Sequence, residues 1–181
     1  MTKRYPDGTV AVDELDLVVA GGRITVFVGP SSCGKTTSLR MINRMIEPTS
    51  GTILLDGKDI QRSQPAQLRR GIGYVIQHAG LFPHRTVLEN VITVPLLVGA
   101  KRKQARAGRR TAGAGRPASR TGHVFVTHDI DEAIKLGDRV AVFRVGGTLA
   151  QRDSPSALLA KPADDFVSAF VGRDRGWRTS R

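Results

Sequence analysis

The chain has 181 residues, enough for one domain of ordinary size, and its 40% hydrophobic and 24% charged residues are typical of a globular protein. A single cysteine excludes an internal disulfide framework, and the longest apolar stretch, residues 91–99, is far shorter than the roughly 20 residues that a membrane-spanning helix needs. Much of the net charge of +12 comes from residues 100–122, which hold eight basic side chains and no acidic one.

The first sixty residues have the pattern of short strands separated by turns. Asp7-Gly8 is typical of a hairpin turn, and the β-branched and apolar run at 24–28 is typical of a strand buried on both faces. Apolar residues at helical spacing predict a helix over 36–46, which Pro48 and Gly51 end. The expected strands cover residues 3–5, 9–12, 13–19, 24–28 and 52–55.

Beyond residue 60 the pattern predicts helices that alternate with strands. Thr86, with Glu89 three residues later, is typical of a capping box. The segment 100–122 has no apolar period and predicts a linker or a disordered tract. This alternation favours an α/β fold with a mainly parallel sheet, to which the early hairpins add an antiparallel layer. Strands are expected at 72–76, 124–127 and 139–144, and helices at 66–70, 86–97, 129–136, 155–160 and 164–171.

One motif points to specific chemistry, because residues 29–36 (GPSSCGKT) fit the pattern G-x-x-x-x-G-K-[ST] without a mismatch. Glycines let backbone N–H groups turn toward anionic oxygens, and the helix that follows adds the positive end of its dipole. Lys35 supplies a positive charge to the β and γ phosphates, and the Thr36 hydroxyl can bind Mg²⁺. The predicted nucleotide-binding residues are Gly29, Pro30, Ser31, Ser32, Cys33, Gly34, Lys35, Thr36 and Thr37, with Cys33 a loop residue without a redox role.

With its surroundings, the motif resembles the ATP-binding cassette (ABC) transporter ATPases over residues 3–99 and 122–176. Among these, the chain is most similar to importers of osmoprotectants such as glycine betaine, choline or carnitine. The resemblance implies a P-loop NTPase core with an antiparallel β subdomain. It divides the chain into an N-terminal part of the cassette at 1–99, a basic linker at 100–122 and a C-terminal part at 123–181. The residues that carry it are 41–51 (MINRMIEPTSG), 72–77 (IGYVIQ), 80–84 (GLFPH) and 163–172 (ADDFVSAFVG).

The resemblance assigns roles to three more residues. Tyr5 matches the aromatic residue that stacks on adenine, and Gln77 matches the Q-loop glutamine that reaches Mg²⁺ and the attacking water. His128 matches the switch histidine that contacts the γ-phosphate, and it follows an expected strand at its carboxyl end, where α/β sheets place ligands. Each residue also has an interpretation without a functional role: Tyr5 as an ordinary tyrosine of a strand, Gln77 as a loop glutamine and His128 as a surface histidine.

The same resemblance implies cofactors, partners and a location. ATP and Mg²⁺ are the implied ligands, and the implied partners are membrane-embedded permease subunits and a second ATPase subunit. The implied location is the cytoplasm, at the inner face of the cell membrane. No apolar segment follows the first residues, so no secretory signal is expected.

Much of the family's hydrolytic machinery has no counterpart in the sequence. Between Gln77 and His128 such ATPases carry a helical subdomain, the LSGGQ signature and the Walker B strand with its Asp and catalytic Glu. Here Glu89 is the only acidic residue of that interval, and no LSGGQ-like motif occurs in the chain. Since a general base contributes about 10²–10⁴ in rate, we expect nucleotide binding with little or no hydrolysis. Loss of a strand from the sheet also leaves edges uncovered, so either the strand at 124–127 moves into the gap or the domain is marginally stable.

Three interpretations remain open at this point. The chain is a shortened importer ATPase, a module that binds ATP or ADP without turnover, or a basic nucleic-acid-binding protein with a vestigial nucleotide site. The Ala, Gly, Arg and Pro content of residues 100–122 favours an internal deletion with a short out-of-register join. That segment has no aromatic side chain to stack on a base, which favours a solvated linker over a nucleic-acid or lipid-binding tract.

Overall fold

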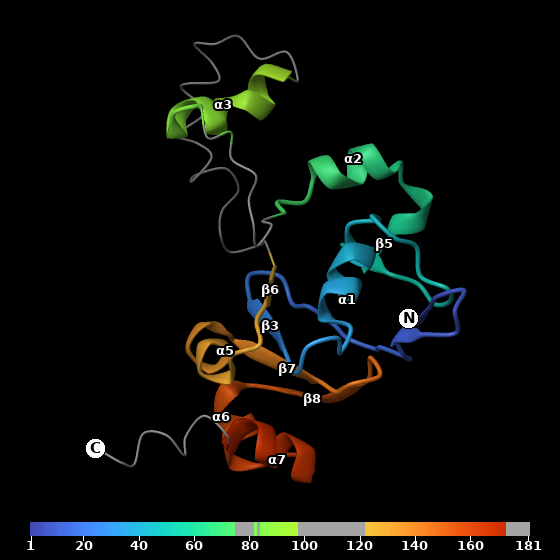
Figure 1. Ribbon diagram of the computed structural model, residues 1–181, viewed down its shortest axis with the longest axis vertical. Helices are drawn as coiled ribbons and strands as arrows, with labels where there is room; N and C mark the ends of the chain where they lie inside the picture. The colour runs from blue at the N-terminus through green and yellow to red at the C-terminus, as the bar shows by residue number, and fades with distance from the viewer. Residues whose placement is uncertain (75–81, 83, 98–121, 173–181) are drawn as a thin grey trace. The chain divides into compact units, whose positions relative to one another are not determined.

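The computed structural model describes residues 1–74, 82, 84–97 and 122–172 (Figure 1). The chain divides into two compact units, one made of residues 1–72 and 121–181 and the other of residues 73–120. Gln77, almost all of the expected linker at 100–122 and the end of the expected strand at 72–76 lie outside the described residues. Within the described part, no helix is long and apolar enough to cross a lipid bilayer.

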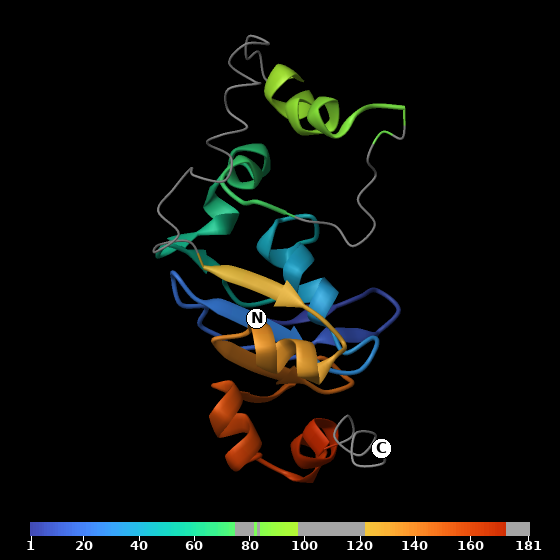
Figure 2. The same ribbon diagram turned by 90° about the vertical axis from the view of Figure 1, so that its left-hand side faces the viewer.

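A four-stranded sheet forms the centre of the first unit (Figure 2). Val26 of the strand β3 lies opposite Phe125 of one parallel neighbour and Val140 of the other, and the fourth strand pairs antiparallel. This arrangement confirms the expected α/β fold with a mainly parallel sheet. The strand order is β6 (His123–Val126), β3 (Ile24–Val28), β7 (Arg139–Phe143) and β8 (Leu149–Asp153).

Two apolar clusters cover the two faces of this sheet. Val26 and Val28 face one cluster, to which the helices α5 (Ile130–Leu136), α6 (Pro155–Ala160) and α7 (Asp165–Gly172) contribute. Phe27 points to the other face, where its ring centroid lies 5.1 Å from that of Phe143, and where Met41 of α1 (Lys35–Ile42) is fully buried. The β-branched run is therefore covered on both sides, as the sequence predicts.

Two short antiparallel hairpins add to the first unit. The turn at Asp7-Gly8 joins β1 (Lys3–Arg4) to β2 (Val10–Val12), and Gly8 has a φ of 85°. This turn confirms the predicted hairpin. A second hairpin joins β4 (Leu54–Leu55) to β5 (Lys58–Asp59), after which come the 3₁₀ helix η1 (Ile60–Arg62) and α2 (Pro65–Arg70).

The prediction of a strand at 13–19 is wrong. Glu14 has a φ of 43°, which takes the backbone out of the extended region. Leu15 is buried and exchanges backbone hydrogen bonds with Met1, but no ladder continues beyond it and Val18 is exposed. The alternation of apolar and polar residues in this segment thus reflects one buried residue, Leu15, and not a strand.

Helix α1 ends four residues before the predicted boundary, at Ile42. Arg44 has a φ of 50°, which a continuing helix excludes, and its guanidinium donates to the carbonyl oxygens of Ile60, Gln61 and Ser63. This tertiary contact ends the helix where the local apolar spacing would continue it.

The second unit contains the helix α3 (Val87–Leu97). The backbone N–H of Thr86 donates to Glu89 Oε2 at 2.9 Å, and the N–H of Glu89 donates to Thr86 Oγ1 at 3.3 Å. These reciprocal bonds confirm the predicted capping box.

Asp138 joins β3 to β7 where both strands begin. Its Oδ2 accepts from the Ile24 N–H at 2.8 Å and its Oδ1 accepts from the Arg23 guanidinium at 3.1 Å. These hydrogen bonds, the backbone one above all, hold the pKa of Asp138 below its ordinary value. The carboxylate therefore stabilises the fold above its unfolded pKa of about 3.9, and this contribution is lost as the pH falls through the lower folded value.

We expect Asp138→Asn to lower the melting temperature at pH 7, with a deficit that shrinks as the pH falls below about 4. Thermal denaturation followed by circular dichroism over a pH series measures this. Asp16→Asn, at an exposed carboxylate outside the sheet, is the control and should show no such trend. A deficit for Asp138→Asn that stays constant with pH would contradict the assignment.

Candidate nucleotide-binding site

The predicted phosphate-binding loop lies between a buried strand and a helix. Strand β3 ends at Val28 and helix α1 begins at Lys35, as the motif requires. Gly34 precedes the first turn in the left-handed conformation, with a φ of 89°. The strand–loop–helix order that the motif predicts is therefore present.

Two glycines of the loop occupy places that exclude a side chain. A Cβ on Gly34 would lie 2.2 Å from the carbonyl oxygen of Ala11, in the strand β2. A Cβ on Gly29 would lie 2.4 Å from the carbonyl oxygen of Phe143, in the strand β7. Gly147, in the turn after β7, packs against the same carbonyl group, because a Cβ on Gly147 would lie 2.4 Å from the carbonyl oxygen of Ala11. The loop is thus packed against backbone on both sides.

Lys35 holds its ammonium group inside the loop and is only 8% exposed. Its Nζ donates to the carbonyl oxygens of Gly29 and Pro30, both at 2.7 Å, and contacts Cys33 Sγ at 3.2 Å. Among the described residues no carboxylate pairs with it. The positive charge of Lys35 is therefore not neutralised by the described part of the protein.

The N-terminus of α1 fits an anion. Its first turn contains no acidic residue, and no side chain caps it. The first N–H groups of a helix have no intrahelical partner and lie at the positive end of the helix dipole. With the ammonium of Lys35 beside them, these groups match the charge of a nucleotide phosphate.

The hydroxyl residues of the loop differ in exposure. Ser31, Ser32 and Thr36 are exposed, and Thr37 is half-buried. Thr36, a predicted Mg²⁺ ligand, is thus accessible from solvent. Gln77, the other predicted metal ligand, is outside the described residues, and the described residues hold no group of three or more His, Cys, Asp or Glu suited to a metal.

Tyr5 lies at the start of the β1–β2 turn, where its N–H donates to the carbonyl oxygen of Thr9. The residue is 36% exposed, and the Lys3 ammonium lies 5.3 Å from the centroid of its ring. The same hairpin supplies Ala11, whose carbonyl packs against Gly34. The structure thus joins the Tyr5 hairpin to the loop and leaves the ring partly accessible.

His128 follows β6 at its carboxyl end and is exposed. Because β6 lies parallel to β3, and the Thr127 N–H donates to the carbonyl oxygen of Phe27 at 3.1 Å, His128 leaves the sheet beside the strand that leads into the loop. Ligands of α/β sheets bind at this edge.

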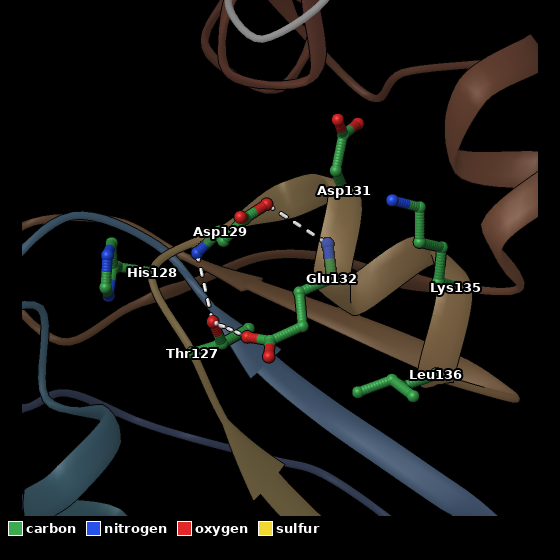
Figure 3. Close-up of a pocket in the computed structure, with 7 residues that line it drawn as sticks. All are labelled: Thr127, His128, Asp129, Asp131, Glu132, Lys135 and Leu136. Carbon is green, nitrogen blue, oxygen red and sulfur yellow. Dashed lines mark hydrogen bonds between the residues drawn. The ribbon is translucent and has the colours of Figure 1, made fainter.

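A cavity of about 520 Å³ adjoins His128 along helix α5 (Figure 3). Glu132 accepts a hydrogen bond from Thr127 Oγ1 at 2.5 Å, and Asp129 caps the helix by accepting from the Glu132 N–H. The Thr127–Glu132 pair was not predicted from the sequence, although a carboxylate in the first turn of a helix was a visible signal. The lining residues are Thr127, His128, Asp129, Asp131, Glu132, Lys135 and Leu136.

Comparison with known proteins agrees with this geometry. Residues 12–139, more than half of the chain, match the ABC transporter family. The chain belongs to the ABC transporter family. It is 37% identical to the carnitine transport ATP-binding protein OpuCA of Listeria monocytogenes, over 97% of this chain and 59% of that protein. It is 32% identical to the glycine betaine uptake system ATP-binding protein YehX of Escherichia coli, over 90% of this chain and 72% of that protein.

The fold of this ABC transporter family member also matches a solved structure. CbiO1 from Clostridium perfringens, part of the ABC transporter complex CbiONQ, superposes with a TM-score of 0.75 at 22% identity, covering 98% of this chain and 92% of that one. At this level of identity the likeness concerns the fold alone.

The alignment with OpuCA is longer than the chain itself. It extends over 235 positions, whereas the chain has 181 residues, and 235 less 181 leaves at least 54 positions without a counterpart inside the aligned span. The chain also spans only 59% of the length of that relative. The comparison therefore agrees with an internally shortened cassette.

Proposed function

We propose that this chain is an ATP-binding subunit of an importer for quaternary-amine osmoprotectants. The observation that carries the proposal is the loop at 29–36, with the buried Lys35 ammonium beside the uncapped N-terminus of α1. The printed names of the relatives, carnitine transport and glycine betaine uptake ATP-binding proteins, support the class of cargo. Permease partners and a place at the inner face of the membrane are part of the same proposal.

Each residue of the proposed site has a task. The N–H groups of the loop and of the first turn of α1 bind phosphate oxygens, and Lys35 contributes its charge. Thr36 holds Mg²⁺, which when bound neutralises part of the phosphate charge, and Gln77 is its second proposed ligand. Tyr5 stacks on the adenine, and His128 contacts the terminal phosphate from the neighbouring strand.

Hydrolysis by this chain is proposed to be weak. Phosphoryl transfer depends on positioned charge and a group that orients the attacking water. The interval from Gln77 to His128 offers Glu89 as its only carboxylate, and Glu89 is engaged in the capping box of α3. The described arrangement therefore supports phosphate binding better than turnover.

The test is to measure binding and turnover on the same preparation. We expect Mg-ATP to raise the melting temperature of the full chain, and phosphate release to stay at the level of a His128→Ala control. Turnover that exceeds this control would contradict the proposal of weak hydrolysis. If Mg-ATP did not change the melting temperature, the proposal of a nucleotide site in this loop would be wrong.

A second candidate is an ATP-binding module that does not serve transport. The positions missing relative to OpuCA favour this second candidate, because an ATPase subunit of a transporter must also dock on its permease and hydrolyse ATP. The genes beside the coding sequence distinguish the two, since a permease and a substrate-binding protein are expected only for the importer subunit.

Retention on DNA that survives removal of residues 101–120 would favour nucleic-acid binding by another surface.

A further inference from the structure

One hydrogen-bond network holds the two residues that flank His128 (Figure 3). Thr127 Oγ1 donates to Glu132 Oε2 at 2.5 Å and accepts from the backbone N–H of Asp129 at 3.1 Å. Asp129 Oδ1 in turn accepts from the Glu132 N–H at 3.1 Å. These three bonds form a closed ring of contacts, so the chain is fixed on both sides of His128.

Glu132 sets the direction of the Thr127 hydroxyl. A hydroxyl has one proton to donate and two lone pairs with which it can accept, whereas an ionised carboxylate only accepts. The proton of Thr127 therefore points to Glu132, which leaves a lone pair for the Asp129 N–H. Because hydrogen bonds to a charged acceptor are stronger than those between neutral groups, the carboxylate of Glu132 contributes most to this network.

The network is attached to the sheet at both ends. Thr127 is only 7% exposed, and its N–H donates to the carbonyl oxygen of Phe27 in β3 at 3.1 Å. Glu132 belongs to α5, whose Ile130 and Ala133 are buried in the cluster that covers one face of the sheet. Glu132 and Thr127 thus connect α5 to the strand that leads into the phosphate-binding loop.

The side chain of His128 has no comparable support. His128 is exposed, and no other described residue forms a hydrogen bond or an ion pair with its imidazole. Figure 3 shows the imidazole pointing away from the Thr127–Glu132 pair. The position of the ring is therefore set by the backbone of residue 128, and the network holds that backbone.

We infer that Glu132 is a positioning residue for His128. Through the Thr127 hydroxyl its carboxylate holds the backbone at residue 128, and so holds the imidazole at the end of the sheet where the phosphate-binding loop begins. The inference rests on the proposed function, in which His128 contacts the terminal phosphate of ATP. Since ADP lacks that phosphate, the contribution of Glu132 should appear with ATP and be absent with ADP.

The first test compares the affinities of the full chain for Mg-ATP and Mg-ADP by isothermal titration calorimetry. We expect Glu132→Ala to weaken ATP binding by about 2–10-fold, the worth of one ordinary hydrogen bond, and to leave ADP binding unchanged. The loss of negative charge alone would act in the opposite direction, because it favours the more negatively charged nucleotide. Asp165→Ala, at an exposed carboxylate in the first turn of α7, is the matched control and should bind both nucleotides as the wild type does.

Variants of Thr127 test the route through the hydroxyl. Thr127→Val keeps the shape of the side chain at this nearly buried position but removes the hydroxyl, and should weaken ATP binding as Glu132→Ala does. Thr127→Ser keeps the hydroxyl and should retain the wild-type preference for ATP over ADP. Unchanged ADP binding shows that each variant is folded. Equal losses of ATP affinity in the serine and valine variants would overturn the inference.

A double-mutant cycle distinguishes positioning of His128 from a general loosening of the site. In a His128→Ala background, Glu132→Ala should have no further effect on ATP binding, because no imidazole remains to be positioned. A further loss as large as in the wild-type background would overturn the inference, and so would an unchanged preference for ATP in Glu132→Ala. These results would leave the nucleotide site in place, whereas a wild type that binds neither nucleotide would overturn the proposed function as well. If His128→Ala bound ATP as the wild type does, the role of His128 and this inference would both be wrong.

Discussion

Replacement of Gly34 by alanine is expected to abolish detectable nucleotide binding and to destabilise the fold by about 2–4 kcal/mol. The residue has a φ of 89°, where a Cβ costs energy, and that Cβ would lie 2.2 Å from the Ala11 carbonyl oxygen. Because the obstacle is backbone and not a flexible side chain, α1 and the loop must move away from β2. The N–H groups that bind phosphate move with them.

Gly8→Ala is the matched control for this substitution. Gly8 has a φ of 85°, almost the same as Gly34, but a Cβ there meets nothing within 4 Å. Chemical denaturation of both variants separates the cost of the backbone conformation from the cost of the contact with Ala11. Equal losses of stability would show that the contact does not matter, and normal ATP binding by Gly34→Ala would contradict the role of the loop.

Lys35→Ala is expected to weaken binding of Mg-ATP by about 10–100-fold, which is the loss of hydrogen bonds to a charged group worth about 1.5–3 kcal/mol. The ammonium is the buried cation of the loop, and its removal also frees the carbonyl oxygens of Gly29 and Pro30. Isothermal titration calorimetry with Mg-ATP measures the change directly.

Lys58→Ala is the control for Lys35→Ala, because Lys58 is an exposed lysine on the strand β5. It should bind Mg-ATP as the wild type does. If the two variants lost affinity equally, the effect would come from net charge and not from the loop. Unchanged affinity in Lys35→Ala would remove the central support of the proposed function.

Local signals in the sequence predicted much of the fold. The apolar run of β3, the loop motif, the Thr86–Glu89 capping box and the Asp7-Gly8 turn each depend on residues close together in the chain, and each is present in the structure. The helix after His128 likewise begins beside its capping residue, Asp129.

Features that depend on distant contacts were not predictable in the same way. The early end of α1 depends on Arg44 and the carbonyl oxygens of residues 60–63, and the false strand at 13–19 reflects contacts of Leu15 with Met1. Strand β8 was missed because its sequence, LAQRD, lacks β-branched residues and is held by pairing with β7. Pairing across the sheet gives it a structure that its own residues do not favour.

The candidate site likewise combines a feature that the sequence predicts with features that depend on distant contacts. The motif located the loop, but the approach of Gly34 to Ala11 and the pairing of Glu132 with Thr127 arise only when β2, α1, β6 and α5 are assembled. No spacing within the chain indicates that these pairs meet. The roles of Tyr5, Gln77 and His128 remain predictions from the family resemblance.

The carbonyl of Ala11 is a meeting point for three segments: the hairpin that carries Tyr5, the start of α1 at Gly34 and the turn at Gly147. None of the three can shift without disturbing the others. Amide hydrogens in these segments should therefore exchange with solvent as one cooperative group, and a molecule held in the loop should slow exchange as far away as the turn after β7.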